Sequence, residues 1–186
     1  MGATALVASA ANASNVLRGA TVTDSCLACP PDKFGAPGAV VDGDHATMRN
    51  LGGGAPGSFT ITTARPVSLD KLVLLPAMTP GGAVSFEIQT SKDASGTAGT
   101  WVSHGGALSR PWADRVPVEV AMNPDTSDVR AVKVIIHQSP SWVALYEIEG
   151  ESGVSKWIYA LVIFAALIAG GLLYRQYRRR QRVASP

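Results

Sequence analysis

Short runs of apolar and β-branched residues, many of them alternating with polar residues, recur along the middle of the chain. Such alternation is typical of β-strands that turn one face to the core and the other to solvent. The runs occupy residues 58–63, 70–75, 84–89, 115–121, 130–136 and 142–149. The segments between them are rich in Gly, Pro, Asn, Asp and Ser, which favour turns. Because no long helical period precedes residue 157, the pattern predicts an all-β sandwich or a Greek-key barrel.

A different pattern follows near the C-terminus, where the eighteen residues between Lys156 and Arg175 carry no charge. A helix of this length spans roughly 27 Å, close to the hydrocarbon thickness of a bilayer. Trp157 lies at one end of the segment and Tyr174 at the other, and aromatic rings favour the headgroup region. The sequence therefore predicts a single transmembrane helix over residues 154–174.

Charge is divided unevenly along the 186 residues, although the formal net charge is only +2. Residues 14–153 contain ten Lys or Arg and fourteen Asp or Glu, whereas residues 154–186 contain six basic residues and no acidic ones. The acidic balance of the larger part argues against a nucleic-acid-binding protein. By the positive-inside rule, the arginines of the basic tail 175–186 place the C-terminus in the cytoplasm, with anionic lipid as their simplest partner.

Residues 1–13 are mostly small and apolar, and they end in Ala11, Asn12 and Ala13, which match the A-x-A pattern before a signal-peptidase site. The basic first region and most of the apolar region of a signal peptide are missing. We interpret residues 1–13 as the remnant of a signal peptide, with a true start upstream and a mature chain that begins near Ser14. The alternative is a flexible Ala-rich N-terminus. The first interpretation makes residues 14–153 an exported ectodomain.

Cys26 and Cys29 form a C-x-x-C pair directly before two prolines. In an exported protein such a pair is expected to oxidise to a local disulfide that pins the following loop. Redox activity, free thiols and intermolecular partners are the alternatives. Four-ligand zinc would need a second cysteine pair, which the chain lacks.

The chain contains His45, His104 and His137, and none of them belongs to a recognisable catalytic motif. A G-x-S-x-G nucleophile elbow is absent from the sequence, and so is a phosphate-cradling Gly loop before a helix. Paired carboxylates such as Glu147 and Glu149 occur, but nothing in the sequence marks a raised pKa. We therefore expect a protein that is not an enzyme.

Six segments of the chain follow one another in the order found in a known family. They are NVLRGATVTDS (15–25), AVVDGDHAT (39–47), SFTITTARPVSLDKLVLL (58–75), VSFEIQTSKDASGTAGTWVSH (84–104), VRAVKVII (129–136) and WVALYEIEGE (142–151). Together they resemble the discoidin domain, also called the coagulation-factor type C or galactose-binding-like domain. The resemblance implies an eight-stranded jelly-roll sandwich whose termini lie close together, with variable binding loops at the far end. A membrane anchor would then hold those loops away from the bilayer.

The segment DGDHAT (residues 42–47) is the most specific candidate binding motif in the chain. Asp42, Asp44 and Thr47 offer hard oxygen ligands, and Gly43 permits a tight turn between them, an arrangement that suits Ca²⁺. In the alternative, the segment is a turn in which the two aspartates hydrogen-bond nearby backbone amides.

The resemblance implies the other ligands of this cation, which are the backbone carbonyls of Ala39 and Tyr146 and the side chain of Glu147. We therefore expect a structural Ca²⁺ bound by these residues and the DGDHAT segment. One departure from the family is Arg49, because the family often has a tryptophan two residues after the threonine of this turn.

Loops at the far end hold the ligand in discoidin-like domains, which bind sugars, lipid headgroups or proteins. On this chain we take Phe34, Arg49, Asn50 and Met78 as the ligand-binding candidates. A stacking tryptophan is not evident among them, and Trp101 is expected to be structural.

These observations favour a noncatalytic, membrane-anchored module that binds glycans or mediates adhesion. We expect it on the bacterial cytoplasmic membrane, with the ectodomain periplasmic or extracellular and the C-terminus cytoplasmic. The alternative is an accessory or structural subunit of a membrane protein complex, docked through its ectodomain and its transmembrane helix. The expected partners are thus the membrane and either a glycan or a membrane protein, but not nucleic acid.

Overall fold

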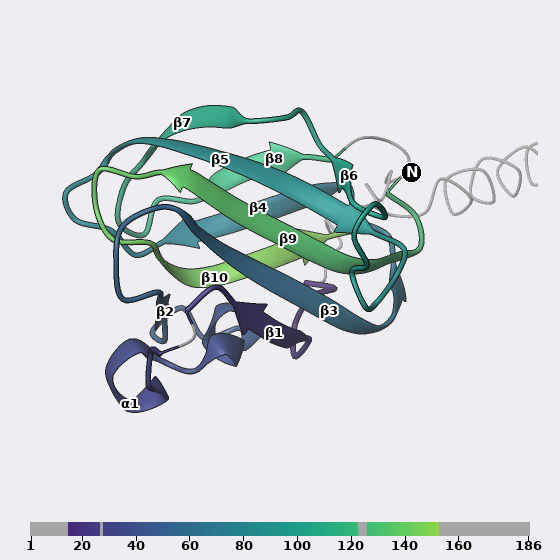
Figure 1. Ribbon diagram of the computed structural model, residues 1–186, viewed down its shortest axis with the longest axis horizontal. Helices are drawn as coiled ribbons and strands as arrows, with labels where there is room; N and C mark the ends of the chain where they lie inside the picture. Colours follow the sequence, from purple (N-terminus) through teal and green to yellow (C-terminus); the bar gives the residue numbers. More distant parts are fainter. Residues whose placement is uncertain (1–14, 27, 123–125, 153–186) are drawn as a thin grey trace, which may run out of the picture. The chain divides into compact units, whose positions relative to one another are not determined.

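Two antiparallel β-sheets face each other in the computed structural model, which describes residues 15–26, 28–122 and 126–152 (Figure 1). Within these residues one sheet has six strands and the other has four. The larger sheet has the order β1 (Thr21–Asp24), β3 (Gly57–Val67), β9 (Val129–Gln138), β5 (Gly82–Ser91) and β6 (Val102–Ser103), and β7 (Leu108–Trp112) also pairs with β5. The smaller sheet has the order β2 (Arg49–Asn50), β10 (Ala144–Glu151), β4 (Lys71–Pro76) and β8 (Val118–Ala121). The predicted all-β sandwich is confirmed.

The alternation of buried and partly exposed residues along the strands explains how the two sheets pack together. In β3, every second residue from Gly57 to Thr63 is buried and the residues between them are partly exposed. Strand β5 repeats this pattern, with Phe86 and Ile88 fully buried. Because successive side chains point to opposite faces of a sheet, the apolar residues of both strands share the inner face.

The core between the sheets is built from aliphatic and aromatic side chains of both layers. Its completely buried members include Phe59, Ile61, Leu72, Leu74, Phe86, Ile88, Val134, Leu145 and Ile148. Burying one such side chain contributes about 1.5–3 kcal/mol, so this cluster is the main source of stability for the sandwich.

Ten strands lie within the described residues, against the eight that were expected. The six runs found in the sequence correspond to β3, β4, β5, β8, β9 and β10. Strand β7 was missed because Pro111 and Arg110 interrupt its apolar pattern. Proline is tolerated there because β7 lies at the edge of its sheet and pairs with β5. Strands β2 and β6 have two residues each, which is too short for any periodicity.

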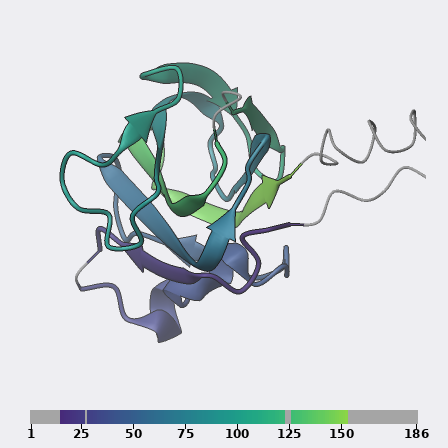
Figure 2. The same ribbon diagram turned by 90° about the vertical axis from the view of Figure 1, so that its right-hand side faces the viewer.

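The two ends of the sandwich differ. At one end, Asn15 and Glu151 form an isolated bridge, and the Gly150 N–H donates a 3.0 Å hydrogen bond to Asn15 Oδ1. Figure 2 shows the purple start of the described chain beside the yellow-green end of β10. We call this the terminal end. The opposite end, where β4 and β7 finish and β10 begins, we call the loop end.

Two short helices connect β1 to β2. Helix α1 (Pro31–Phe34) buries none of its residues, whereas the 3₁₀ helix η1 (Pro37–Val41) buries its last three and packs against β1 and β10. Proline near the start of each helix supplies a φ already suited to the first turn.

All the described strands and the core belong to one unit of the chain, residues 1–152. Among the described residues no helix is both long and apolar enough to cross a bilayer. The predicted signal-peptide remnant 1–13, transmembrane helix 154–174 and basic tail 175–186 lie outside the described residues.

Candidate functional site

A pocket of about 210 Å³ opens at the loop end of the sandwich. We call it the loop-end pocket. Its walls come from β2 and the residue before it, the β4–β5 loop, the β7–β8 loop and the start of β10. The side chains that matter for binding are Met48, Asn50, Met78, Asp114, Trp142 and Tyr146. These residues are far apart in the sequence and meet because their strands start or finish at the same end.

Trp142 gives the loop-end pocket an exposed aromatic wall. It is 45% exposed, although its indole Nε1 donates a 2.9 Å hydrogen bond to the Ala77 carbonyl oxygen. The neighbouring Ser141 hydroxyl donates to the Thr79 carbonyl oxygen at 3.0 Å, which ties the segment before β10 to the β4–β5 loop. An aromatic ring that is held in place and left open to solvent can stack on the apolar face of a sugar.

Arg115 supports another part of the same pocket. Its guanidinium carbon lies 4.0 Å from the centroid of the Tyr146 ring, and its Nη1 donates a 2.8 Å hydrogen bond to the His45 carbonyl oxygen. The cation therefore covers one face of the tyrosine and joins the β7–β8 loop to the DGDHAT segment. Asp114, the exposed residue before it, supplies the pocket with a carboxylate.

Two of the four predicted ligand-binding residues line this pocket. Asn50 is partly buried and its Oδ1 accepts a 2.8 Å hydrogen bond from the Gly52 N–H, so its amide NH₂ is the group that can donate to a ligand. Met78 is 2% exposed and forms part of the wall instead of an open contact. Phe34 does not line the pocket; it is partly buried at the end of α1, close to Gly52.

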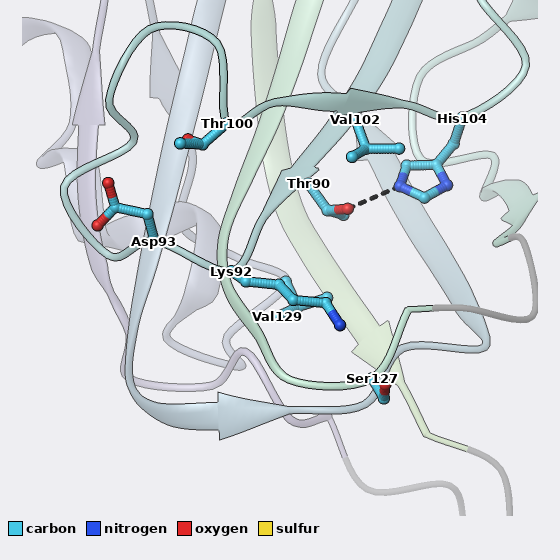
Figure 3. A pocket seen from close by; sticks show the side chains of 8 residues that line it. All are labelled: Thr90, Lys92, Asp93, Thr100, Val102, His104, Ser127 and Val129. Carbon is cyan, nitrogen blue, oxygen red and sulfur yellow. Dashed lines mark hydrogen bonds between the residues drawn. The ribbon is translucent and has the colours of Figure 1, made fainter.

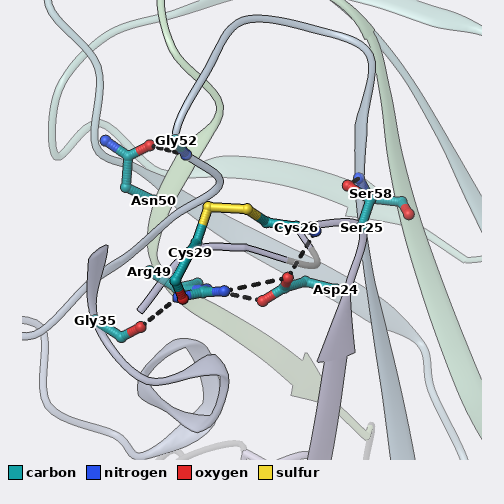
Figure 4. Close-up of a disulfide and its surroundings, with 9 residues drawn as sticks. All are labelled: Asp24, Ser25, Cys26, Cys29, Gly35, Arg49, Asn50, Gly52 and Ser58. Carbon is teal, nitrogen blue, oxygen red and sulfur yellow. Dashed lines mark hydrogen bonds and ion pairs between the residues drawn. A yellow bond between two sulfur atoms is a disulfide. The ribbon is translucent and has the colours of Figure 1, made fainter. Parts of the chain in front are cut away.

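The prediction that Arg49 contacts a ligand is wrong, because its side chain is buried under the loops with 2% exposure. Its Nε and Nη2 donate to the two carboxylate oxygens of Asp24 at 2.8 and 3.2 Å. Its Nη1 donates to the carbonyl oxygens of Cys29 at 3.1 Å and Gly35 at 2.6 Å (Figure 4). A buried guanidinium needs such partners for its charge and its donors. Arg49 thus fixes β2, whose neighbouring residues line the pocket.

Cys26 and Cys29 form a disulfide beside this ion pair, with their Cα atoms 5.7 Å apart (Figure 4). The Cys26 N–H also donates a 2.9 Å hydrogen bond to Asp24 Oδ1, so one carboxylate holds both Arg49 and the start of the disulfide loop. Gly35, whose carbonyl oxygen also accepts a hydrogen bond from Arg49, packs closely against Met48. It has a φ of +78°, and a Cβ on it would overlap the Met48 carbonyl oxygen.

The DGDHAT segment folds as a tight turn. Asp42 Oδ1 accepts a 2.7 Å hydrogen bond from the Asp44 N–H, and Asp44 Oδ1 accepts one of 2.9 Å from the Ala46 N–H. The Thr47 hydroxyl donates to Asp42 Oδ2 at 2.8 Å and lies 3.5 Å from the Ala39 carbonyl oxygen. The aspartates therefore do hydrogen-bond backbone amides, and the same turn gathers three of the expected ligand oxygens.

Glu147 completes this cluster from β10. Its carboxylate is fully buried and accepts hydrogen bonds of 3.2 and 3.3 Å from the Gly43 N–H. Burial raises the pKa of Glu147 to about 7, the Gly43 N–H lowers it in part, and the carboxylates of Asp42 and Glu149 raise it further. A buried carboxylate beside a second carboxylate is stabilised by a cation.

Tyr146 lies at a β-bulge, because the ladder between β10 and β4 passes from Leu145 to Glu147 while β4 advances by one residue. The extra residue of a bulge stays outside the ladder. The described residues contain no group of three or more His, Cys, Asp or Glu that could hold a metal. The available donors are two carboxylates with hydroxyl and carbonyl oxygens, a set that suits Ca²⁺ better than zinc.

No protein-family model and no curated protein matches this sequence. Solved structures do match. A pectin-binding carbohydrate-binding module is 20% identical with a TM-score of 0.57, and the match covers 77% of this chain and 94% of that one. The family 32 module of NanJ from C. perfringens, solved in complex with galactose, is 12% identical with a TM-score of 0.55, over 75% of this chain and 98% of that one.

An F5/8 type C domain from Bacteroides fragilis is also similar, at 20% identity and a TM-score of 0.56, over 73% of this chain and 93% of that one. These matches span almost the whole of each neighbour. Residues 15–152 therefore have the discoidin-like β-sandwich fold that carbohydrate-binding modules and F5/8 type C domains share.

Proposed function

We propose that this protein is a noncatalytic carbohydrate-binding module that holds a glycan in its loop-end pocket. The exposed Trp142 carries the proposal, because it offers a sugar an aromatic surface that is already fixed by a hydrogen bond. Asn50 and Asp114 lie in the same pocket and offer a donor and an acceptor for sugar hydroxyls. The fold shared with carbohydrate-binding modules supports the same function.

The volume of the loop-end pocket limits what it can hold. At about 210 Å³ it is smaller than the pockets of roughly 300–1,000 Å³ that enclose drug-sized ligands. We therefore expect it to grip one sugar unit, such as the end of a chain, with further units lying outside. Because binding relies on one aromatic ring and a few hydrogen bonds, we expect the affinity of this single pocket for a glycan to be modest.

A structural Ca²⁺ is part of the proposal. Asp42, Asp44 and Glu147, the Thr47 hydroxyl and the carbonyl oxygen of Ala39 would hold it, with the carbonyl of Tyr146 as a further ligand. The bound ion would neutralise the buried Glu147 carboxylate. Because Tyr146 also lines the loop-end pocket, the ion would stabilise one wall of the glycan site.

We further propose that the module is anchored in the bacterial cytoplasmic membrane by a helix over residues 154–174, with the domain periplasmic or extracellular and the tail 175–186 cytoplasmic. The uncharged apolar segment and the arginines after it support this topology.

A glycan array probed with residues 1–152 tests the function, since this unit contains all the described strands and the core. We expect binding to a restricted set of glycans by the wild type and loss of that binding in Trp142→Ala. Trp142→Phe should keep part of the binding because it keeps a ring. Val102→Ala, at an exposed apolar residue of the opposite end of the sandwich, is the matched control and should bind like the wild type. Glycan binding that Trp142→Ala leaves unchanged would contradict the proposed site.

A further inference from the structure

The terminal end of the sandwich carries a second and larger pocket, of about 850 Å³ (Figure 3). We call it the terminal-end pocket. It lies where β5 finishes and β9 begins, with β6 on one side, and no residue of the loop-end pocket lines it. Its volume is within the range of roughly 300–1,000 Å³ found for small-molecule sites.

Two valines make part of this pocket apolar. Val102, on β6, is 59% exposed, and Val129, at the start of β9, is buried against the core. The exposed side chain of Val102 gives an apolar ligand a surface that it can cover. The pocket therefore favours a ligand with an apolar body.

The terminal-end pocket is lined by one charge of each sign. Lys92 lines the pocket, and among the described residues no carboxylate forms an ion pair with it. The neighbouring Asp93 accepts hydrogen bonds from the hydroxyls and backbone N–H groups of Ser95 and Thr97, which hold the pKa of its carboxyl well below the usual range and keep it ionised. Figure 3 shows the Lys92 ammonium and the Asp93 carboxylate pointing apart. The two charges therefore act at different places in the pocket, and the ammonium is the one on the side of Ser127.

A buried imidazole forms part of the pocket wall. His104 is 6% exposed, and its Nε2 lies 2.7 Å from the Thr90 hydroxyl, which also lines the pocket. In Figure 3 the other ring nitrogen lies on the side of the ring away from Thr90. The contact with Thr90 therefore holds the ring in place at the pocket, where a bound ligand would change its surroundings.

We propose that the terminal-end pocket binds a small amphipathic anion, with its apolar body against Val102 and Val129 and its anionic group at Lys92. The hydroxyl of Ser127, which lies on the ammonium side of the pocket in Figure 3, offers the anionic group a further hydrogen bond. A cationic amphiphile would be repelled by Lys92, and a neutral sugar would leave the valines uncovered. This site is separate from the proposed glycan site and does not depend on it.

Octanoate is a suitable probe, with octanol and octylammonium as the neutral and cationic counterparts of the same chain length. Binding to residues 1–152 is measured by calorimetry and by the NMR signals of the histidine rings, of which the chain has three. We expect octanoate to bind most tightly and to move the His104 ring signals, while the His45 signals stay in place. Equal affinity for the three probes, or shifts that leave His104 unmoved, would overturn the proposal.

Two variant pairs locate the octanoate site. Lys92→Met should weaken octanoate binding about two- to fivefold, the range for one exposed ion pair, while Lys33→Met on α1 should leave it unchanged. Val102→Asp puts a negative charge into the pocket and should abolish binding, whereas Val116→Asp at a comparably exposed valine should not. Equal losses within either pair would place the binding elsewhere. The melting temperature of each variant shows that it is folded.

Discussion

At the scale of single residues, the buried ion pair of Arg49 and Asp24 is the contact on which the loop end most depends. It connects β1 to β2, and Arg49 also holds the carbonyl oxygens of Cys29 and Gly35. Removing one member of a buried ion pair leaves the other charge without a partner in a medium of low dielectric. The pair therefore holds the walls of the loop-end pocket in position more than it adds to net stability.

We predict that Arg49→Met lowers the free energy of unfolding by about 3–5 kcal/mol, because Asp24 is left as an uncompensated buried charge. Urea denaturation of residues 1–152 measures this. Arg65→Met, at an exposed arginine, is the control and should change stability by no more than about 0.5 kcal/mol. A loss below about 1 kcal/mol for Arg49→Met would show that the pair is not buried as described.

His104 predicts a dependence of stability on pH. Burial lowers its pKa below the ordinary value of 6.5, so the unfolded chain binds a proton at a higher pH than the folded chain does. The stability that results is present above pH 6.5 and is lost as the pH falls through the folded pKa. His104→Gln, which cannot titrate, should therefore lose less stability than the wild type between pH 8 and pH 5 in urea denaturation. His45 and His137 are present in both proteins, so they do not contribute to the difference between the two. Identical slopes of unfolding free energy against pH would refute the prediction.

Residue identity alone did not reveal which loop side chains line the loop-end pocket. Trp142 stands 64 positions after Met78 and is not among the predicted ligand-binding residues, yet its indole bonds to Ala77 in the same pocket. Arg49 was taken for an exposed contact because its partner Asp24 is 25 residues away in the sequence. The available signal was that Arg49 occupies a position where related domains often carry a core tryptophan.

At the scale of elements, strands with alternating burial were predictable, including the edge strand β8, whereas very short or irregular edge strands were not. Strands β3, β5 and β9 alternate because one face meets the core, and their positions agree with the predicted runs to within a few residues. Strand β7 has four residues without alternating burial before Trp112, since an edge strand that pairs with β5 need not bury every second side chain. Short and irregular edge strands also limit pairing with other chains.

The DGDHAT turn and β10 together predict a response to calcium. Added Ca²⁺ should raise the melting temperature of residues 1–152, with a gain of about 2.7 kcal/mol at a hundred times the dissociation constant. Glu147→Gln keeps the shape of the side chain but removes its charge, so this variant should fold without Ca²⁺ and show no shift when it is added. Asp32→Asn, at an exposed carboxylate on α1, should keep the full shift. Equal shifts in the wild type and Glu147→Gln would rule out the proposed ligand set.

At the scale of the whole molecule, the sandwich separates its two pockets. The loop-end pocket lies at the end where β4 and β7 finish, and the terminal-end pocket lies at the opposite end, where β5 finishes and β9 begins. The two-sheet architecture was predictable because alternating runs and turn formers determine it together. The positions of the pockets were not predictable from the sequence. Each pocket is formed by loops that the strand order and register of the folded sheets bring together.

The proposed topology makes its own prediction for the full chain. Extraction of bacterial membranes with high salt should leave the protein in the membrane, whereas a chain ending at residue 152 should be released, because only the longer chain contains the apolar segment. Protease added to intact spheroplasts should digest the domain and spare the basic tail. Release of the full chain by salt would contradict an integral anchor, and digestion of the tail in intact spheroplasts would contradict its orientation.

The most direct measurement is a ¹H–¹⁵N NMR titration of residues 1–152 with the best ligand from the glycan array. Binding at the loop-end pocket predicts that the indole N–H of Trp142 and the side-chain amide of Asn50 shift together, with a single dissociation constant. It also predicts that backbone signals around Thr90 and Val102, at the terminal end, stay in place. Saturable glycan binding that moves the terminal-end signals and leaves Trp142 and Asn50 unchanged would contradict the account.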